Sequence, residues 1–305
     1  MTDEAAEHLK LELCWLDLAL ERQVLRTRAL LESGPDAYRG LFIADAAVDT
    51  LIHGSQSGAS ADLDLAIATA MLDCRRSLAR APDLPLRRLE KALGLDEWER
   101  AALVITSAPE LDARYATLYG YVQNDVTRKL ATADLVLKLL CTTREQQWLR
   151  RENLTSGSSL FRNCLIQEAD EKREIPLLLR SLAPAPRIIS FLLGKTELDP
   201  AVVPAQFTSG ADIASLELPQ ETRKRLTAAA AIIRHGGVLQ VTGATGSGKR
   251  AVAAAVAHTI GKRLIALDLR ETATKSLDAR ILHRECKLLD AALYLRTNDD
   301  PDAAV

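Results

Sequence analysis

The N-terminal part of the chain carries an apolar pattern with the period of a helix. Leucine and valine recur there at spacings of three and four, at Leu9, Leu13, Leu16, Leu20 and Val24. Residues 3–32 contain neither Gly nor Pro, so the pattern predicts one long helix that the Ser-Gly-Pro of residues 33–35 ends. Because the pattern is lost beyond Val24, we expect this helix to pack on the same chain rather than in a coiled coil.

More helices are expected between this helix and residue 141. A short helix over 46–52 and a flexible loop over 53–60 come first. The apolar spacing then predicts helices over residues 62–80, 86–93, 96–105, 115–122 and 133–140. Gly94 would close one of them, and Asp96 and Thr132 would each cap the start of another. Pro109, which follows Ala108, is expected to break the chain's helical course.

A hairpin is expected after these helices. Leu160–Gln167 and Ile175–Leu179 have the composition of strands, and the stretch between them is charged. Helices followed by a hairpin are the order of a winged helix, so residues 81–194 predict such a module. Pro184–Gly194 would be a helix that leaves it, and the acidic, proline-bearing residues 195–219 would be a linker.

Residues 237–257 combine an apolar strand, a glycine-rich loop and an alanine-rich helix in immediate succession. The strand is Val238–Val241, and a second strand, Arg263–Asp268, follows the helix as a βαβ unit requires. In such a phosphate-binding loop, or P-loop, backbone N–H groups and a lysine hold phosphate at the N-terminus of a helix. The predicted cofactor-binding residues are Gly243, Ala244, Thr245, Gly246, Ser247, Gly248, Lys249 and Arg250.

The last of these residues departs from the usual pattern. A Ser or Thr hydroxyl normally stands at position 250 of such a loop and coordinates Mg²⁺, whereas the guanidinium of Arg250 cannot bind a cation. The sequence therefore predicts ATP as the cofactor and leaves the placement of Mg²⁺ open.

The length of 305 residues is sufficient for two domains. We expect an N-terminal helical region over 1–80, a winged-helix-like domain over 81–194, a linker over 195–219 and a partial P-loop NTPase domain over 220–305. The predicted fold class is α/β overall, with a predominantly helical N-terminal half.

Composition excludes several classes of protein. Apolar residues make up 48% of the chain, but no run approaches the roughly 18 residues of a membrane helix, and the acidic N-terminus lacks a signal peptide's basic start. A cytoplasmic location without a membrane partner is expected. The five cysteines are scattered without a C-x-x-C pair, so neither a zinc site nor a disulfide framework is predicted, and buried thiols are expected. A net charge of −2 gives no general attraction to nucleic acid.

Three segments carry a resemblance to a known family: Tyr38–Asp45, Ala108–Arg128 and Ser190–Gly194. In this order they resemble bacterial AAA+ ATPases that carry a variant winged-helix domain before the ATPase core. These include the ATPase encoded with extracellular contractile injection systems. The resemblance covers nearly the whole chain and implies a remodelling machine driven by nucleoside triphosphate. Its implied partners are other AAA+ protomers in a ring oligomer, or a protein client.

The C-terminal part departs from this family. The resemblance implies a magnesium-positioning Asp at the end of the strand Ala291–Leu295, and Arg296 stands there instead. Asp299 and Asp300 follow shortly afterwards and are the remaining metal candidates. The sequence ends at Val305 without the sensor residues, arginine finger and lid domain that the family contains. We therefore expect either a fragment of a longer protein or a truncated open reading frame, which binds nucleotide without efficient hydrolysis, and no catalytic residue is assigned.

A different class of function is a non-catalytic adaptor whose P-loop only holds nucleotide. Its winged helix would then bind a protein or DNA. The expected recognition helix, Ala133–Leu140, offers only Lys138 to bases and phosphates, which favours a protein partner. A basic cluster in the preceding helices is interpreted as solvated helical faces, and its members are Arg75, Arg76, Arg80, Arg87 and Arg88.

Overall fold

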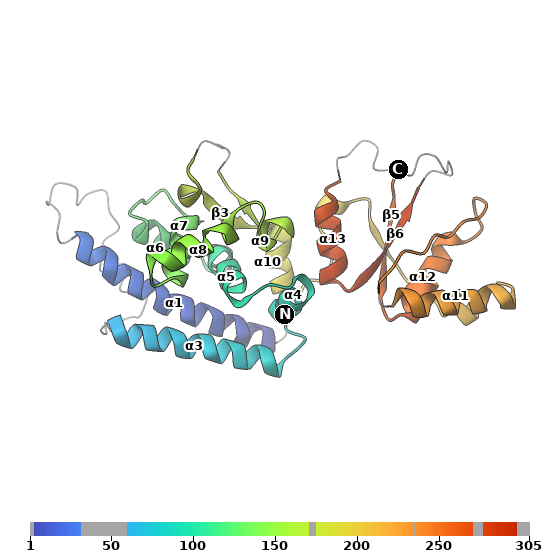
Figure 1. The fold of residues 1–305 in the computed structure, drawn as a ribbon, viewed down its shortest axis with the longest axis horizontal. Helices are drawn as coiled ribbons and strands as arrows, with labels where there is room; N and C mark the ends of the chain where they lie inside the picture. Colours follow the sequence, from blue (N-terminus) through green and yellow to red (C-terminus); the bar gives the residue numbers. More distant parts are fainter. Residues whose placement is uncertain (1–2, 32–59, 171–174, 235, 271–276, 298–305) are drawn as a thin grey trace. The chain divides into compact units, whose positions relative to one another are not determined.

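A computed structural model of the chain describes residues 3–31, 60–170, 175–234, 236–270 and 277–297 (Figure 1). The chain divides into two compact units, residues 1–195 and 196–305, and each contains its own three-stranded sheet. Several predictions lie outside the described residues: the helix over 46–52, nearly all of the loop after it, the segment Tyr38–Asp45, and the metal candidates Asp299 and Asp300.

Two long helices of the first unit, α1 (Asp3–Leu31) and α3 (Ser60–Arg80), lie side by side (Figure 1). Three later helices also contact α1: α5 (Glu97–Leu111), α6 (Arg114–Val122) and α7 (Ala133–Leu140). Because α1 is covered from several directions, Trp15, Leu16 and Leu20 are almost completely buried. The prediction that this helix packs on its own chain is confirmed, and residues 1–80 share their core with the helices that follow.

The predicted helix ends around residue 95 are present. Gly94 closes α4 (Pro85–Leu93) in the left-handed conformation, with φ of 67°. Asp96 accepts the backbone N–H of Glu99 at 2.7 Å, and the Glu99 carboxylate accepts the backbone N–H of Asp96 at 3.0 Å. This reciprocal capping box satisfies donors that α5 would otherwise leave unpaired at its start.

The predicted break at Pro109 is wrong, since α5 continues through it to Leu111. A proline inside a helix lacks the N–H that would donate to the carbonyl four residues earlier, here that of Ile105. The hydroxyl of Tyr119, a fully buried residue of α6, donates to that carbonyl at 2.7 Å. A side chain therefore supplies the missing hydrogen bond, and the helix can tolerate its proline.

The first unit contains the predicted hairpin, with strands that differ from the expected ones. The antiparallel sheet has the order β1-β3-β2, with β1 (Ala131–Thr132), β2 (Ile166–Glu168) and β3 (Ser181–Pro184). The expected strand Leu160–Gln167 is correct only at its end, because α9 (Ser159–Arg162) occupies its start. The expected partner Ile175–Leu179 is wrong, since Leu177–Leu179 form a 3-10 turn before β3.

Two local features move these strands. Cys164 has φ of 50°, and the N–H of Leu165 donates to the carbonyl of Leu160 at 2.9 Å, which ends α9 with a left-handed turn. Pro176 has no N–H for a ladder position, so pairing begins beyond it. After the hairpin, α10 (Pro186–Leu192) forms the predicted helix that leaves the module.

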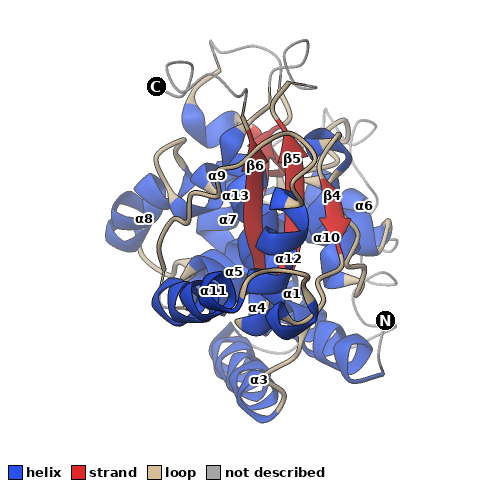
Figure 2. Cartoon of the chain, turned by 90° about the vertical axis from the view of Figure 1, so that its right-hand side faces the viewer, coloured by secondary structure: helices blue, strands red, loops and turns tan. Residues whose placement is uncertain are grey.

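The second unit is built on the sheet β4-β5-β6 (Figure 2). The strands are β4 (Gln206–Thr208), β5 (Arg263–Asp268) and β6 (Ala291–Arg296); β4 is antiparallel and β6 parallel to β5. The helices are α11 (Gln220–Ile233), α12 (Lys249–Thr259) and α13 (Ala279–Leu288). Ala254 and Ala257 of α12 pack on Leu264, which places α12 against one face of this sheet. The predicted helix at Lys249 and the predicted strand 263–268 are confirmed.

The stretch 195–219, expected to be a linker, contributes to this unit. It supplies β4 to the sheet and Ile213 to a buried cluster with Ala230 and Ala255. A Cβ atom on Gly210 would lie 2.1 Å from the carbonyl oxygen of Ala254, so only glycine permits this close approach to α12.

The predicted strand Val238–Val241 is wrong, because this stretch lies outside the sheet. Val238 is 98% exposed, whereas Leu239 packs against the buried cluster of α11 and α12. A strand requires a neighbour that supplies its hydrogen-bond ladder, and β-forming composition alone does not provide one.

Candidate functional site

The glycine loop before α12 has the backbone geometry that its sequence suggests. Gly246 and Gly248 have φ of 85° and 80°, in the left-handed region that favours glycine. A Cβ atom on Gly243 would lie 2.9 Å from the hydroxyl oxygen of Ser247, so the loop closes on itself there. Gly248 is the N-cap of α12, and the loop therefore leads directly into the N-terminus of an eleven-residue helix.

Lys249 lies over the loop that it follows. Its Nζ donates to the carbonyl oxygens of Gly243 at 2.5 Å and Ala244 at 3.1 Å. Both acceptors are neutral carbonyls, so the lysine's positive charge is not neutralised by them. A cation above a glycine loop at the positive end of a helix dipole is an arrangement that attracts an anion.

The loop borders a cavity of about 390 Å³ in the second unit. The cavity lies at the carboxyl ends of the parallel strands β5 and β6, which is where open α/β sheets bind their ligands. Its lining residues are Pro204, Gln206, Thr245, Gly246, Ser247, Gly248, Lys249, Arg250, Ala266, Leu267, Asp268, Tyr294 and Arg296. The structure thus brings six of the eight predicted cofactor-binding residues to one cavity.

Asp268, at the end of β5, is held by two arginines. Its carboxylate accepts Nη2 of Arg270 at 2.6 Å and lies 3.4 Å from Nη1 of Arg296. The hydrogen bonds from Arg270, and then the charge of Arg296, lower the pKa of Asp268 to about 2. Arg296 therefore does more than occupy the position where an Asp was expected: it neutralises a carboxylate on the neighbouring strand.

Arg250 reaches across to β4. Its Nε and Nη2 donate to the hydroxyl oxygen of Thr208 at 2.8 and 2.6 Å. The hydroxyl is neutral, so this contact positions the guanidinium without neutralising its charge.

The residues present do not fit the Mg²⁺ site that the AAA+ resemblance implies. Arg250 offers no ligand oxygen, and Asp268 is the one carboxylate among the described residues that line the cavity. Both oxygens of Asp268 accept hydrogen bonds from Arg270. Within the described ranges, no three His, Cys, Asp or Glu side chains gather as a metal cluster would.

Sequence reasoning missed Asp268 and Thr208. The signal for Asp268 was present, because it ends a correctly predicted strand, and the carboxyl end of a parallel strand adjoins the loop of a βαβ unit. Thr208 lies in the stretch interpreted as a linker, and nothing local placed it near Arg250.

In the first unit, the expected recognition helix is a core helix. All of α7 except Asp134, Lys138 and Leu140 is buried, and Lys138 pairs with Asp134 at 2.6 Å. The helical segments between α7 and the hairpin are α8 (Arg144–Arg150), a 3-10 turn at Arg151–Leu154, and α9. The assignment of Ala133–Leu140 as recognition helix is therefore corrected: α8 and α9 hold the position before the hairpin.

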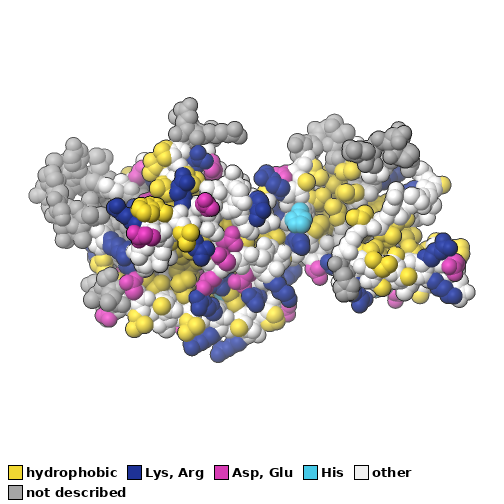
Figure 3. Space-filling view, in the orientation of Figure 1, with side chains coloured by type: hydrophobic (Ala, Val, Ile, Leu, Met, Phe, Trp, Pro, Cys, Tyr) yellow, Lys and Arg dark blue, Asp and Glu magenta, His cyan; other side chains and the backbone are white. Residues whose placement is uncertain are grey.

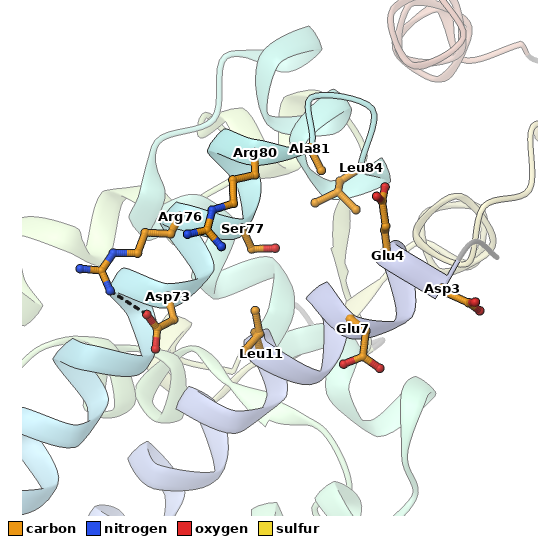
Figure 4. A pocket seen from close by; sticks show the side chains of 10 residues that line it. All are labelled: Asp3, Glu4, Glu7, Leu11, Asp73, Arg76, Ser77, Arg80, Ala81 and Leu84. Carbon is orange, nitrogen blue, oxygen red and sulfur yellow. Dashed lines mark hydrogen bonds and ion pairs between the residues drawn. The ribbon is translucent and has the colours of Figure 1, made fainter.

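The basic cluster of the first unit is largely paired, as its interpretation as helical faces required. Arg75 pairs with Glu97, Arg76 with Asp73 and Arg87 with Glu90, and Arg88 lies over the ring of Phe191. Arg76 and Arg80 border a groove of about 560 Å³ between α1 and α3, opposite Glu4 and Glu7 (Figure 4). Opposite charges are also interspersed across the visible face of this unit (Figure 3). This groove therefore offers no concentrated field to a charged ligand.

Other expectations concern thiols and membranes. Cys74 and Cys141 are buried as predicted, whereas Cys164 and Cys286 are half-buried and Cys14 is exposed, which corrects the expectation of five buried thiols. Among the described helices, none is long and apolar enough to cross a membrane.

Comparison with known proteins finds a family for most of the chain, from the first unit to the start of β4. The family model of the variant winged helix domain matches residues 3–206. No curated protein and no solved structure matches the chain. The sheet order β1-β3-β2, preceded by helices, agrees with this match, and the AAA+ relation stays a prediction. Since the matched region covers most of the sequence, the chain belongs to the variant winged helix domain family.

Proposed function

We propose that the second unit binds the phosphates of a nucleotide, ATP or ADP, through the loop Gly243–Arg250. The observation that carries this proposal is the placement of the loop: it caps α12 and borders the cavity at the carboxyl ends of β5 and β6. Loop N–H groups, the helix dipole and Lys249 each favour a bound anion there.

Binding is proposed here without efficient hydrolysis. Turnover requires a positioned metal ion, an oriented water and a cation that stabilises the transition state. The described residues that line the cavity offer Asp268 as their carboxylate, and Arg270 and Arg296 hold it. In the remodelling machine that the AAA+ resemblance implies, this chain would bind nucleotide beside other protomers or a protein client.

The experiment is calorimetric titration of the full chain with ATP and ADP. We expect a dissociation constant on the order of tens of micromolar, because the contacts proposed here are to the phosphates of the nucleotide alone. Lys249→Ala should weaken binding about tenfold or more, since it removes a charge-assisted contact to phosphate. Lys224→Ala is the matched control, because Lys224 is an exposed lysine of α11 outside the cavity. Equal binding by the Lys249→Ala variant and wild type would show that the loop is a turn without a role in phosphate binding.

A second candidate function is a protein-interaction module formed by the winged-helix unit. The observation that favours it is α8, which exposes 69% of Trp148 and 76% of Leu149. Tryptophan is enriched at the centres of protein interfaces. Trp148 and Leu149 together leave apolar surface of one short helix in contact with water.

DNA is the rival partner for this unit. Fluorescence anisotropy with duplex DNA should reveal only weak affinity, because the exposed charges of the unit are mixed in sign. A sub-micromolar dissociation constant that rises steeply with added salt would instead support phosphate contacts and DNA binding.

A further inference from the structure

The cavity that does not suit Mg²⁺ is lined by positively charged side chains. Three of its lining residues are cationic: Lys249, Arg250 and Arg296. Lys249 and Arg250 donate to neutral acceptors, namely loop carbonyls and the Thr208 hydroxyl. Their charges are therefore available to an anionic ligand in the cavity.

Arg296 can contact such a ligand without leaving the Asp268 carboxylate unpaired. Its Nη1 lies 3.4 Å from Oδ2 of Asp268, whereas Nη2 of Arg270 lies only 2.6 Å from the same oxygen. Arg270 is not a lining residue of the cavity and holds Asp268 through both of its oxygens. The side chain of Arg296 is 39% exposed, and Asp268 would stay neutralised if this arginine turned its guanidinium to a phosphate.

We propose that this cavity binds a nucleoside diphosphate or triphosphate without a divalent cation, with Arg250 and Arg296 supplying the charge that Mg²⁺ supplies in other P-loop proteins. The proposal rests on the proposed function, since it concerns the same loop. Planar guanidiniums bind phosphate through paired hydrogen bonds, so two of them can neutralise a polyphosphate chain that a metal would otherwise bridge.

The position of Arg250 supports this role. Its guanidinium is anchored to β4 by two hydrogen bonds to one hydroxyl, at 2.8 and 2.6 Å. The side chain starts from the first turn of α12, so it lies beside the loop that holds the phosphates. An arginine held in this way loses less conformational freedom on binding than one that is fully solvated.

The test is titration of the full chain with ATP in EDTA and, separately, in excess MgCl₂. Wild type should bind equally or several-fold more tightly in EDTA, because Mg²⁺ neutralises part of the charge that the arginines recognise. Arg296→Gln should weaken binding in EDTA about tenfold, the loss of one charge-assisted contact. Arg280→Gln is the matched control, since Arg280 lies at the start of α13, outside the cavity.

A second variant tests the proposal by reversal. Arg250→Ser combined with Arg296→Asp restores the hydroxyl and the carboxylate of a metal-dependent loop. Binding by this variant should become weaker in EDTA than in MgCl₂. Circular dichroism tests whether this double variant is folded. If it is unfolded, the effect of Arg296→Gln on ATP binding in EDTA decides the proposal.

The outcomes separate this inference from the proposed function. Wild-type binding that is lost in EDTA but depends on Lys249 would overturn the metal-free site and leave nucleotide binding intact. Wild-type affinity in EDTA that is unchanged by Arg296→Gln would also overturn it. Absence of binding under both conditions, or binding indifferent to Lys249→Ala, would refute both proposals together.

Discussion

Replacement of Tyr119 by Phe should destabilise the winged-helix unit by removing one buried hydrogen bond. The Tyr119 hydroxyl donates at 2.7 Å to the carbonyl of Ile105, and both residues are fully buried. Pro109 cannot donate to that carbonyl, so Tyr119→Phe leaves a buried acceptor without a partner. Such a loss costs about 1–3 kcal/mol, and we expect about 2 kcal/mol here.

A double-mutant cycle with Pro109→Ala tests this reason. Alanine at position 109 restores a backbone N–H that can donate to Ile105 in helical geometry, so the Tyr119→Phe change should then cost only about 0.5 kcal/mol. The expected coupling between the two positions is therefore about 1.5 kcal/mol.

Urea unfolding followed by tryptophan fluorescence measures this cycle. All three tryptophans, Trp15, Trp98 and Trp148, belong to the winged-helix unit, so the signal reports that unit alone. With an m-value of about 2 kcal/mol/M, Tyr119→Phe should lower the midpoint by about 1 M. Tyr294→Phe, in the other unit, is the control and should leave this transition unchanged. Equal costs of Tyr119→Phe with and without the Pro109→Ala change would refute the argument.

Two further predictions concern the second unit. The carboxyl of Asp268 should titrate near pH 2 in an NMR experiment, so its ion pairs contribute stability above its ordinary pKa of 3.8 that is lost as the pH falls toward 2. Arg270→Ala should move this midpoint back toward 3.8, and an unmoved midpoint would contradict the cause assigned to it. In chemical denaturation, Leu239→Ser should cost about 1–2 kcal/mol because Leu239 packs on a buried cluster. Val238→Ser should change stability by less than about 0.5 kcal/mol because Val238 is 98% exposed, and similar costs at both positions would refute this difference.

The sequence by itself determined most helices and their ends. Asp96 and Thr132 cap α5 and α7, Gly94 closes α4, and α12 begins at Lys249, all as predicted. These features depend on contacts within a few residues, such as the side-chain oxygen of a cap and the N–H it accepts. A local pattern contains all the information that such contacts need.

The sequence also specified the strands β5 and β6 and the glycine loop that precedes α12. The burial of Leu264, Ile265 and Leu267 agrees with the apolar run that predicted β5. A continuous apolar run is a local signal as well, because a strand covered on both faces is apolar at successive positions.

Tertiary structure alone decided which segments pair and which charges meet. Val238–Val241 has the composition of a strand but no ladder partner, whereas Gln206–Thr208, in an expected linker, pairs with β5. Likewise, the contact of Arg296 with Asp268 and the bond from Tyr119 that accommodates Pro109 join different elements. Pairing energies of this kind depend on neighbours that are distant in sequence, so composition and spacing along one segment could not reveal them.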